Sequence, residues 1–448
     1  MSRSGGTGRT GGIAWRVWIR KRVLLLLPFL AILPLPPVAA QSPNTARLVV
    51  LVSDQSGAVV PGATVAAVNS ATSARREAVS GADGSATIGA LPIAGSYVVT
   101  VSLSGFSTET IKDVSLDAGT TATIRVRLTV AGGSSSVTVY GAADNVHAEP
   151  ELGQRFDAEQ LDTLPVIGRK ISAVPLLNAA FRPAKGTGDL FMNSVYVVTG
   201  AGGRREANFV VDGASADEPW GRQTMFSTLP IGAVQEMNVM SRAFSAEFGW
   251  TSSAAVNIVT RSGSNQTRGE ALFLGRPGAL QPTAMSGDLQ CAESAASCVA
   301  PTTNGTPSAL VPPDIPDSLA QGSMAIGGPV SKDRTQFFAS ADLTRQDRTA
   351  AITTPLVTTG TTIVGNYRQA LLDARGDHRI NPANSVMARV NIDRFYDTNP
   401  QDAVSGTVLP SAGRQFTRHS WTAQVNETAV ISSSMLNEAR FELQDADP

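Results

Sequence analysis

The fold of this chain is decided by a stretch near its middle, Ala255-Val256-Asn257-Ile258-Val259-Thr260-Arg261-Ser262-Gly263-Ser264-Asn265. The stretch closes a segment of mixed character, residues 142–265, in which short strand-like runs alternate with polar loops. From residue 268 the pattern changes to amphipathic strands of about 8–12 residues that follow one another in pairs, as in a membrane β-barrel. The stretch therefore marks the change from a mixed α+β unit to a barrel-like sheet.

The barrel-like segment, residues 266–448, is predicted to contain about seven strands joined by alternating short and long connections. We expect these strands at Arg268–Arg276 and at residues 322–330, 335–346, 367–380, 385–396, 415–431 and 436–444. Short connections are expected to face the periplasm and long ones the outside. An open sheet of seven strands would leave its edges unsatisfied in lipid, so we expect an incomplete barrel, from a natural fragment or a truncated chain.

Two cysteines, Cys291 and Cys298, lie in the long connection of residues 280–321. In an exported protein such a pair favours a disulfide that closes a small loop. The alternative is a metal site, which would need more thiol or imidazole ligands than this neighbourhood offers. We therefore predict a disulfide in an extracellular loop.

Residues 1–40 have the pattern of a secretory signal peptide. Basic residues between 16 and 22 precede an apolar run, residues 23–35, that prolines interrupt. Small residues before the Ala40-Gln41 bond fit cleavage between these two residues. The alternative, a transmembrane anchor, is disfavoured because the run is too short to cross a hydrocarbon core of about 30 Å as a helix.

Residues 41–130 predict a small β-sandwich of the immunoglobulin-like kind. About seven short strands are separated by turn signals such as Asp83-Gly84. The strands alternate apolar and polar residues, which indicates one buried face for each strand. The clearest apolar faces are Tyr97, Val99, Val101 and Leu103 in one strand and Ile124, Val126, Leu128 and Val130 in the last. Residues 131–141, rich in Gly and Ser, predict a linker.

The turn residues of this sandwich carry a resemblance. In order they are Ser56-Gly57, Val60-Pro61-Gly62-Ala63, Asp83-Gly84, Gly95-Ser96-Tyr97 and Gly105-Phe106. This order resembles the carboxypeptidase regulatory-like domain, and the resemblance implies a transthyretin-like, carbohydrate-binding-like sandwich fold with no protease chemistry. The resemblance covers nearly all of residues 47–130.

Four motifs succeed one another in residues 142–265. They are Asn208-Phe209-Val210-Val211-Asp212-Gly213, Val234-Gln235-Glu236, Ser245-Ala246-Glu247-Phe248-Gly249 and the stretch that ends at Asn265. Together they resemble the plug domain of TonB-dependent outer-membrane transporters, in the branch that carries the regulatory-like domain in front. The resemblance implies functional plug positions at Asn208, Asp212, Gly213, Glu236, Glu247, Gly249, Asn257, Thr260, Ser262, Gly263 and Asn265.

The same resemblance implies a TonB-contacting box at Val137, Thr138, Val139, Tyr140 and Gly141. The alternative for this segment is a last sandwich strand or plain linker. The implied function is a receptor or transporter of the Gram-negative outer membrane that takes up a scarce solute, either a siderophore, an oligosaccharide or a peptide. Its implied partners are TonB on the periplasmic side, the outer membrane and an extracellular solute. The rival is a non-transporting cell-surface adhesion or carbohydrate-binding envelope protein.

Catalytic motifs are missing from the sequence. The three histidines, His147, His378 and His419, are widely spaced, and no zinc-hydrolase motif, nucleophile elbow or Walker loop occurs. The carboxylates Asp212 and Glu247 are better explained as a turn residue and a plug contact than as a catalytic pair. Because the net charge is −1 and only 16% of residues are charged, nothing indicates nucleic acid. We expect no enzyme activity and no cofactor.

Overall fold

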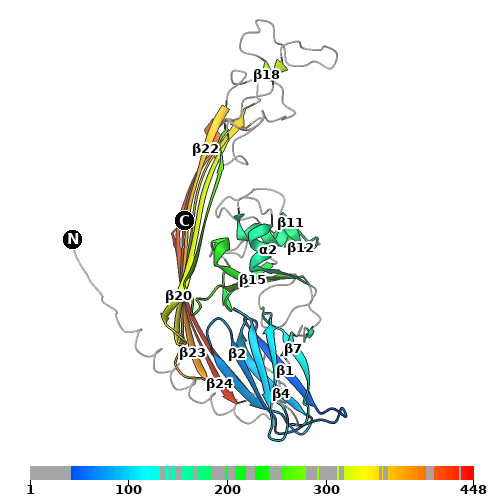
Figure 1. The fold of residues 1–448 in the computed structure, drawn as a ribbon. Coiled ribbons are helices and arrows are strands. Elements are labelled where there is room, and N and C mark those ends of the chain that lie inside the picture. The colour runs from blue at the N-terminus through cyan, green and yellow to red at the C-terminus, as the bar shows by residue number, and fades with distance from the viewer. Residues whose placement is uncertain are drawn as a thin grey trace, which may run out of the picture. The chain divides into compact units, whose positions relative to one another are not determined.

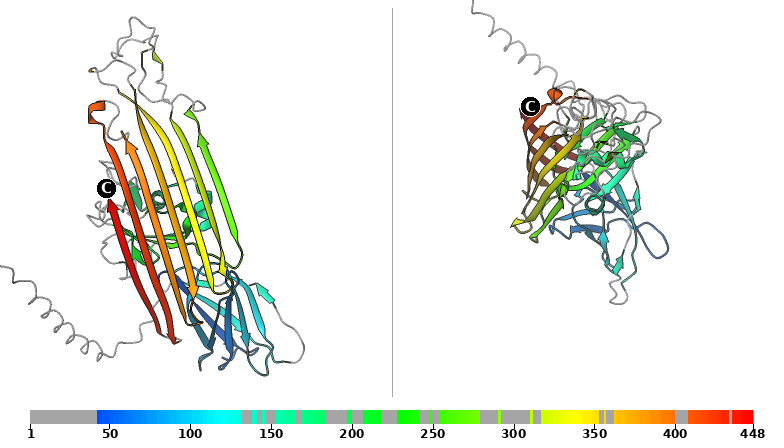
Figure 2. Two further views of the ribbon diagram at one scale, coloured as in Figure 1. Left: turned by 90° about the vertical axis from the view of Figure 1, so that its left-hand side faces the viewer. Right: turned by 90° about the horizontal axis from the view of Figure 1, so that it is seen from above.

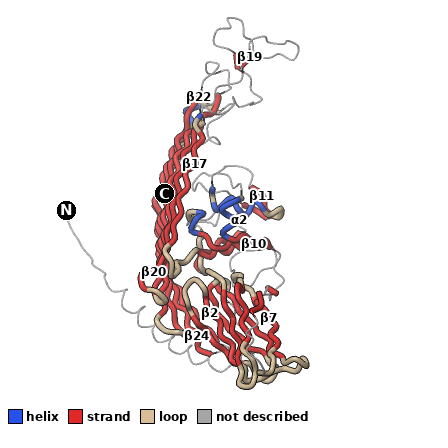
Figure 3. Tube along the Cα trace, viewed as in Figure 1, coloured by secondary structure: helices blue, strands red, loops and turns tan. Residues whose placement is uncertain are grey.

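The computed structural model describes residues 42–131, 138–140, 144–146, 153–164, 169–183, 197–199, 207–217, 228–241, 248, 254–278, 290–291, 310–311, 317–352, 356, 362–399, 408–432 and 435–447. The chain divides into Met1–Ala40 and Gln41–Pro448, and every residue described here belongs to the second unit. The predicted signal peptide and the Ala40-Gln41 bond therefore lie outside the description. The mainly β class is confirmed, since strands dominate and helical segments are short (Figure 1, Figure 3).

Two sheets form the predicted sandwich. The first has the order β4-β1-β7-β9 and contains β1 (Thr45–Ser53), β4 (Ser85–Pro92), β7 (Thr121–Arg127) and β9 (Asp144–Val146). The second has the order β3-β2-β5-β6-β8 and contains β2 (Thr64–Asn69), β3 (Arg75–Val79), β5 (Tyr97–Ser102), β6 (Glu109–Val114) and β8 (Thr138–Tyr140). The last strand of each sheet comes from beyond residue 131, so part of the predicted linker belongs to the sandwich.

The sandwich core follows the predicted alternation. Strand β1 buries every second residue, and Tyr97, Val99 and Val101 of β5 are fully buried against it. The Tyr97 hydroxyl donates a 2.7 Å hydrogen bond to the Pro92 carbonyl, and burial raises the pKa of Tyr97 to about 12. One prediction is wrong: Val130 is 66% exposed. Strand β7 ends at Arg127, so the alternation does not continue to residue 130.

The turn at Asp83-Gly84 is confirmed between β3 and β4. Gly84 has φ +74°, and a Cβ atom there would lie 2.7 Å from the Val52 carbonyl oxygen. An Asp83 carboxylate oxygen accepts a 3.0 Å hydrogen bond from the backbone N–H of Ser85. Glycine is required here both for its conformation and for the close approach of β1.

A central sheet follows, with the order β10-β15-β16-β13-β14. Its strands are β10 (Gly153–Asp157), β13 (Ala207–Val211), β14 (Ala214–Ser215), β15 (Val234–Ser241) and β16 (Ala254–Thr260). Strand β16 lies between β15 and β13 and is buried at every position, including its polar residues Asn257 and Thr260. The helix α2 (Ala158–Thr163) accompanies this sheet and begins with a capping box between Asp157 and Gln160.

Short elements accompany this sheet. They are the 3-10 helices η2 (Ile171–Leu177) and η3 (Ile231–Ala233) and the paired strands β11 (Phe181–Pro183) and β12 (Val197–Thr199). Among the helices in the described ranges, none is long and apolar enough to cross a membrane.

The third part is a seven-stranded antiparallel sheet, the wall, shown edge to edge in Figure 2. Its strands are β17 (Arg268–Arg276), β20 (Ser318–Ser331), β21 (Thr335–Ala351), β22 (Thr362–Arg379), β23 (Asn384–Thr398), β24 (Gln415–Ser432) and β25 (Met435–Asp447). Each predicted strand is found, and most extend further than predicted toward the long connections. A separate pair, β18 (Gln290–Cys291) and β19 (Leu310–Val311), lies between β17 and β20 in sequence.

The wall has polar residues on its buried face and apolar residues on its exposed face. On β23, Asn391 and Asp393 are buried, whereas Val390 between Arg389 and Asn391 is 44% exposed. The exposed apolar side chains include Met324, Ile326, Leu343, Leu372, Trp421, Val425, Phe441 and Leu443. A polar interior with an apolar exterior is the polarity of an outer-membrane barrel wall.

Candidate functional site: the junction of the central sheet with the wall

The junction is built on the predicted Asp-Gly turn between β13 and β14. Asp212 has φ +48° and Gly213 has φ +81°, as a type I′ hairpin turn requires, and Val211 pairs with Ala214 across it. A Cβ atom on Gly213 would lie 2.6 Å from Cζ of Arg440 on β25. Because Gly213 has no side chain, the backbone of this turn can lie directly against the wall.

The Asp212 carboxylate is buried and bonded to the neighbouring strand β16. Its Oδ1 accepts a 3.0 Å hydrogen bond from the Thr260 N–H, and its Oδ2 accepts a 2.7 Å bond from the Thr260 hydroxyl. The side chain of Asp212 is only 3% exposed. These bonds fix the direction in which the carboxylate faces the wall.

Two arginines of the wall balance this buried charge. Arg375 on β22 places Nη1 3.4 Å from Asp212 Oδ1, and Arg389 on β23 places Nε 3.2 Å from Asp212 Oδ2. Nη1 of Arg389 also lies 3.4 Å from Oδ2 of buried Asp373. Because an unpaired buried charge is costly, the carboxylates and guanidiniums are found together.

The backbone of the turn is held as well. The Asp212 carbonyl accepts hydrogen bonds from Gln424 Nε2 at 2.9 Å and Asn426 Nδ2 at 2.8 Å, both on β24. Arg389 Nη2 donates to Gln424 Oε1 at 2.8 Å. Side chains from three adjacent wall strands, β22, β23 and β24, thus bind the turn at Asp212. We call Asp212, Gly213, Thr260, Arg375, Arg389, Gln424 and Asn426 the Asp212 junction.

A second contact follows at the end of the stretch that opened the sequence analysis. Asn265 accepts a 2.8 Å hydrogen bond from the Asp333 N–H and donates a 2.6 Å bond to the Asp333 carboxylate, in the turn between β20 and β21. A Cβ atom on Gly263 would lie 2.2 Å from the Phe337 carbonyl oxygen. Glycine at 263 therefore permits the chain to pass closely along β21.

Other predicted plug positions contact the sandwich. Glu236 on β15 accepts a 3.3 Å hydrogen bond from the Ala118 N–H, and Asn257 Nδ2 donates a 3.0 Å bond to the Pro43 carbonyl. Desolvation of Glu236, which is 5% exposed, raises its pKa to about 7. Arg155 on β10 forms an ion pair with Asp117 nearby.

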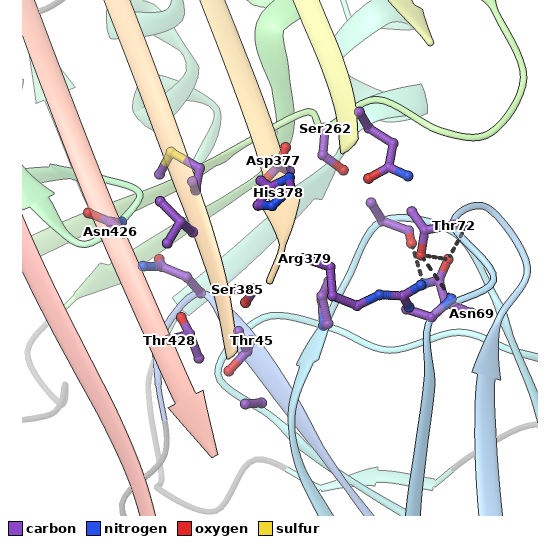
Figure 4. A pocket seen from close by; sticks show the side chains of 18 of the residues that line it. Thr45, Asn69, Thr72, Ser262, Asp377, His378, Arg379, Ser385, Asn426 and Thr428 are labelled. Carbon is purple, nitrogen blue, oxygen red and sulfur yellow. Dashed lines mark hydrogen bonds between the residues drawn. The ribbon is translucent and has the colours of Figure 1, made fainter. Parts of the chain in front are cut away.

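A cavity of about 190 Å³ lies where the three parts meet. Figure 4 shows Ser262 of the predicted plug motif beside His378 and Arg379 of β22, with Asn69 and Thr72 from the sandwich. Its charged lining mixes both signs, for example Arg379 and Glu427. In the part of the chain that the structure describes, no group of three or more His, Cys, Asp or Glu residues is placed to hold a metal ion.

Of the remaining predicted positions, the structure describes some in part and others not at all. Asn208 is buried on β13, and Thr138, Val139 and Tyr140 form β8. Cys291 lies on β18, where its backbone alone is described. Outside the described residues are Val137, Gly141, Glu247, Gly249 and Cys298. The predicted disulfide therefore stays a prediction.

Sequence reasoning missed the wall side of the junction. Arg375, Arg389, Gln424 and Asn426 were assigned to strands without a role. The signal was nonetheless present, because Arg389 occupies an inward position in the alternation of β23, where a charge needs a partner.

Comparison with known proteins agrees with this architecture. Family models match the carboxypeptidase regulatory-like domain over residues 47–129 and an outer membrane beta barrel domain over residues 365–447. The TonB-dependent transporter Oar of Myxococcus xanthus is 32% identical over 135 residues, which are 30% of this chain and 11% of Oar.

Two solved structures align with part of this chain. The transporter YddB from Escherichia coli aligns with a TM-score of 0.47 and 9% identity, covering 62% of this chain and 37% of YddB. A variant of the ferric enterobactin receptor PfeA from Pseudomonas aeruginosa aligns with a TM-score of 0.46 and 13% identity, covering 66% of this chain and 40% of PfeA. The chain thus spans about a tenth of its curated relative and about two fifths of these solved chains. Two stretches of this chain are thus similar to a carboxypeptidase regulatory-like domain and to an outer membrane beta barrel domain, and a stretch of 135 residues is similar to the TonB-dependent transporter Oar.

Proposed function

We propose that this chain is the sandwich, plug and first wall strands of a TonB-dependent transporter that takes up a scarce solute, of the siderophore, oligosaccharide or peptide class. Residues 41–130 are the periplasmic sandwich, 131–141 the linker with the TonB box, 142–265 the plug and 266–448 the wall. The observation that carries the proposal is the Asp212 junction, in which a turn of the central sheet is held by polar groups of three wall strands.

Polar attachment suits a plug that must move. The central sheet has its own apolar core, which includes Phe209, Val239 and Ile258. Among the described residues, the buried apolar cluster shared with the wall consists of Ala233, Ala325 and Phe338. Because a hydrogen bond exchanged for water costs only about 0.5–1.5 kcal/mol, such a plug can shift without exposing a large apolar surface.

The force for such a shift would come from TonB through Val137, Thr138, Val139, Tyr140 and Gly141. This box immediately precedes the plug in sequence, so a pull on it is transmitted toward β10, the first strand of the central sheet. A short β-prone segment can be recognised by strand addition to a partner's sheet. The mechanism requires no cofactor from this chain.

The test is the binding of the TonB C-terminal domain to the purified chain in detergent. Val139→Pro removes a backbone donor and disfavours strand pairing, so we expect at least tenfold weaker binding. Ser134→Pro, in the same linker but outside the box, is the matched control and should bind like the wild type. Equal binding by the wild type and Val139→Pro would reject this box.

The rival function, surface adhesion through the sandwich, finds no support in its aromatic residues. An adhesion face for sugars would present exposed aromatic rings. Tyr97 is 1% exposed, and Phe106 packs against the sandwich core. These two rings stabilise the sandwich instead of forming a binding platform.

A further inference from the structure

Strand β8 lies at the edge of the second sandwich sheet, beside β6. The two strands are parallel, with Thr110 opposite Thr138, Ile111 opposite Val139 and Lys112 opposite Tyr140. These three residues of β8 are the centre of the proposed TonB box. The sequence left two roles open for this segment, a sandwich strand or a TonB contact, and the structure shows it in the first.

We infer that β6 is a docking edge for the TonB box, and that TonB must displace β8 from β6 to act on the plug. The inference rests on the proposed function in so far as residues 137–141 contact TonB. The new element is a competition within the chain: β6 of the sandwich binds the box in the resting receptor, and TonB must compete with β6 for it.

Strand β8 covers residues 110–112 of the six-residue β6. Ile111 and Val114 of β6 are buried in the sandwich core, so β6 is firmly held on its β5 side. Asp113 has φ +58°, and the β5–β6 register shifts between Tyr97 and Val99, opposite this part of β6. This irregularity lies just beyond the residues of β6 that β8 covers, and pairing with β5 resumes at Val114.

The path of the chain favours this pairing. After β7, residues 129–131 make two backbone hydrogen bonds with residues 105–107. Ser107 N–H donates to the Thr129 carbonyl at 2.8 Å, and Ala131 N–H donates to the Gly105 carbonyl at 3.0 Å. The chain thus leaves the sandwich core beside residues 105–107, just before β6 begins at Glu109. In sequence, six residues, 132–137, separate this point from β8. A tether this short gives a local concentration of about the millimolar order, so even a three-residue ladder can compete with a partner in solution.

The segment after the box is also attached to the sandwich. Strand β9 pairs antiparallel with β7, with Asp144 opposite Thr123 and Val146 opposite Thr121. The box is therefore held between attachments to both sandwich sheets. A pull on β8 would load these ladders before it reached the plug, so release from β6 must precede plug movement.

A disulfide across the ladder tests the inference. In a Cys291→Ser, Cys298→Ser background, Thr110→Cys with Thr138→Cys places the new thiols at paired positions. We expect oxidation to cross-link them and to weaken binding of the TonB C-terminal domain at least tenfold, with full recovery after reduction. The out-of-register pair Lys112→Cys with Thr138→Cys should not cross-link. Unchanged circular dichroism of the reduced variant establishes that it folds.

Hydrogen exchange provides an independent readout. In the wild type, those amides of residues 110–112 on β6 that face β8 should be protected, and both Val139→Pro and saturating TonB domain should speed their exchange at least tenfold. Failure of the paired cysteines to cross-link, or protection that persists when TonB is bound, would overturn the docking edge. Failure of the proposed function would look different, because TonB would then not bind the wild-type chain through the box at all.

Discussion

The Thr260 hydroxyl donates a 2.7 Å hydrogen bond to Oδ2 of Asp212, across 48 residues of sequence. This bond joins the end of β16 to the turn after β13, two strands that run parallel in the central sheet. It also aims the carboxylate at Arg389, whose Nε lies 3.2 Å from the same oxygen. A bond inside the central sheet thereby sets the geometry of its attachment to the wall.

Neutralising this carboxylate should loosen the attachment. Asp212→Asn leaves Arg375 and Arg389 buried with one counter-charge fewer, and we expect a loss of about 3–5 kcal/mol in the free energy of unfolding. Urea unfolding in detergent, followed by tryptophan fluorescence, measures it. Glu77→Gln breaks the exposed ion pair with Arg75 and should cost less than about 1 kcal/mol. Similar losses in both variants would contradict a special role for Asp212.

Glycine 263 should tolerate no side chain. In Gly263→Ala the new Cβ would lie 2.2 Å from the Phe337 carbonyl oxygen, and backbone can move away only by displacing β21. We expect a destabilisation of about 1–3 kcal/mol, visible as a lower unfolding midpoint. Gly322→Ala, on β20 with no atom within 4 Å of its Cβ, is the matched control and should leave the midpoint nearly unchanged.

The contact of the sandwich with the central sheet should weaken as pH rises. Burial raises the pKa of Glu236 from 4.5 to about 7, so the folded chain binds more protons than the unfolded chain between these values. The unfolding free energy should therefore fall by up to about 3 kcal/mol from pH 4.5 to pH 7 through this group. Glu236→Gln should remove that component, so its unfolding midpoint should exceed that of the wild type at pH 8 and approach it at pH 5. An identical pH profile in wild type and variant would refute this assignment.

The apolar face of the wall should tolerate no charge. Leu372 lies on the outer face of β22 and is 42% exposed. Leu372→Arg would place a guanidinium toward lipid, at a cost of about 2–4 kcal/mol near the bilayer centre. We expect less of the chain in the outer-membrane fraction after sucrose-gradient separation. Leu372→Phe keeps the face apolar and should fractionate like the wild type; equal fractionation of the arginine variant would mean that this face does not meet lipid.

The sequence by itself determined the elements whose signals are local. Strand β17 was predicted at Arg268–Arg276, its observed bounds, because alternation of period two and the flanking turns are both contained in a short window. The Asp212-Gly213 turn was predictable for the same reason, since positive φ at two adjacent positions selects these residues. The order of the plug motifs likewise needs no tertiary information.

Tertiary structure alone decided which distant residues meet. Nothing near Asp212 in sequence indicates Arg375 or Gln424, because these partners depend on the register of wall strands more than 160 residues away. Val259, at the end of β16, joins the core of the sandwich, although its own sequence neighbours belong to the central sheet. The same limit applies to Thr138–Tyr140, where β propensity predicts a strand but only the assembled edge of β6 determines which sheet it joins.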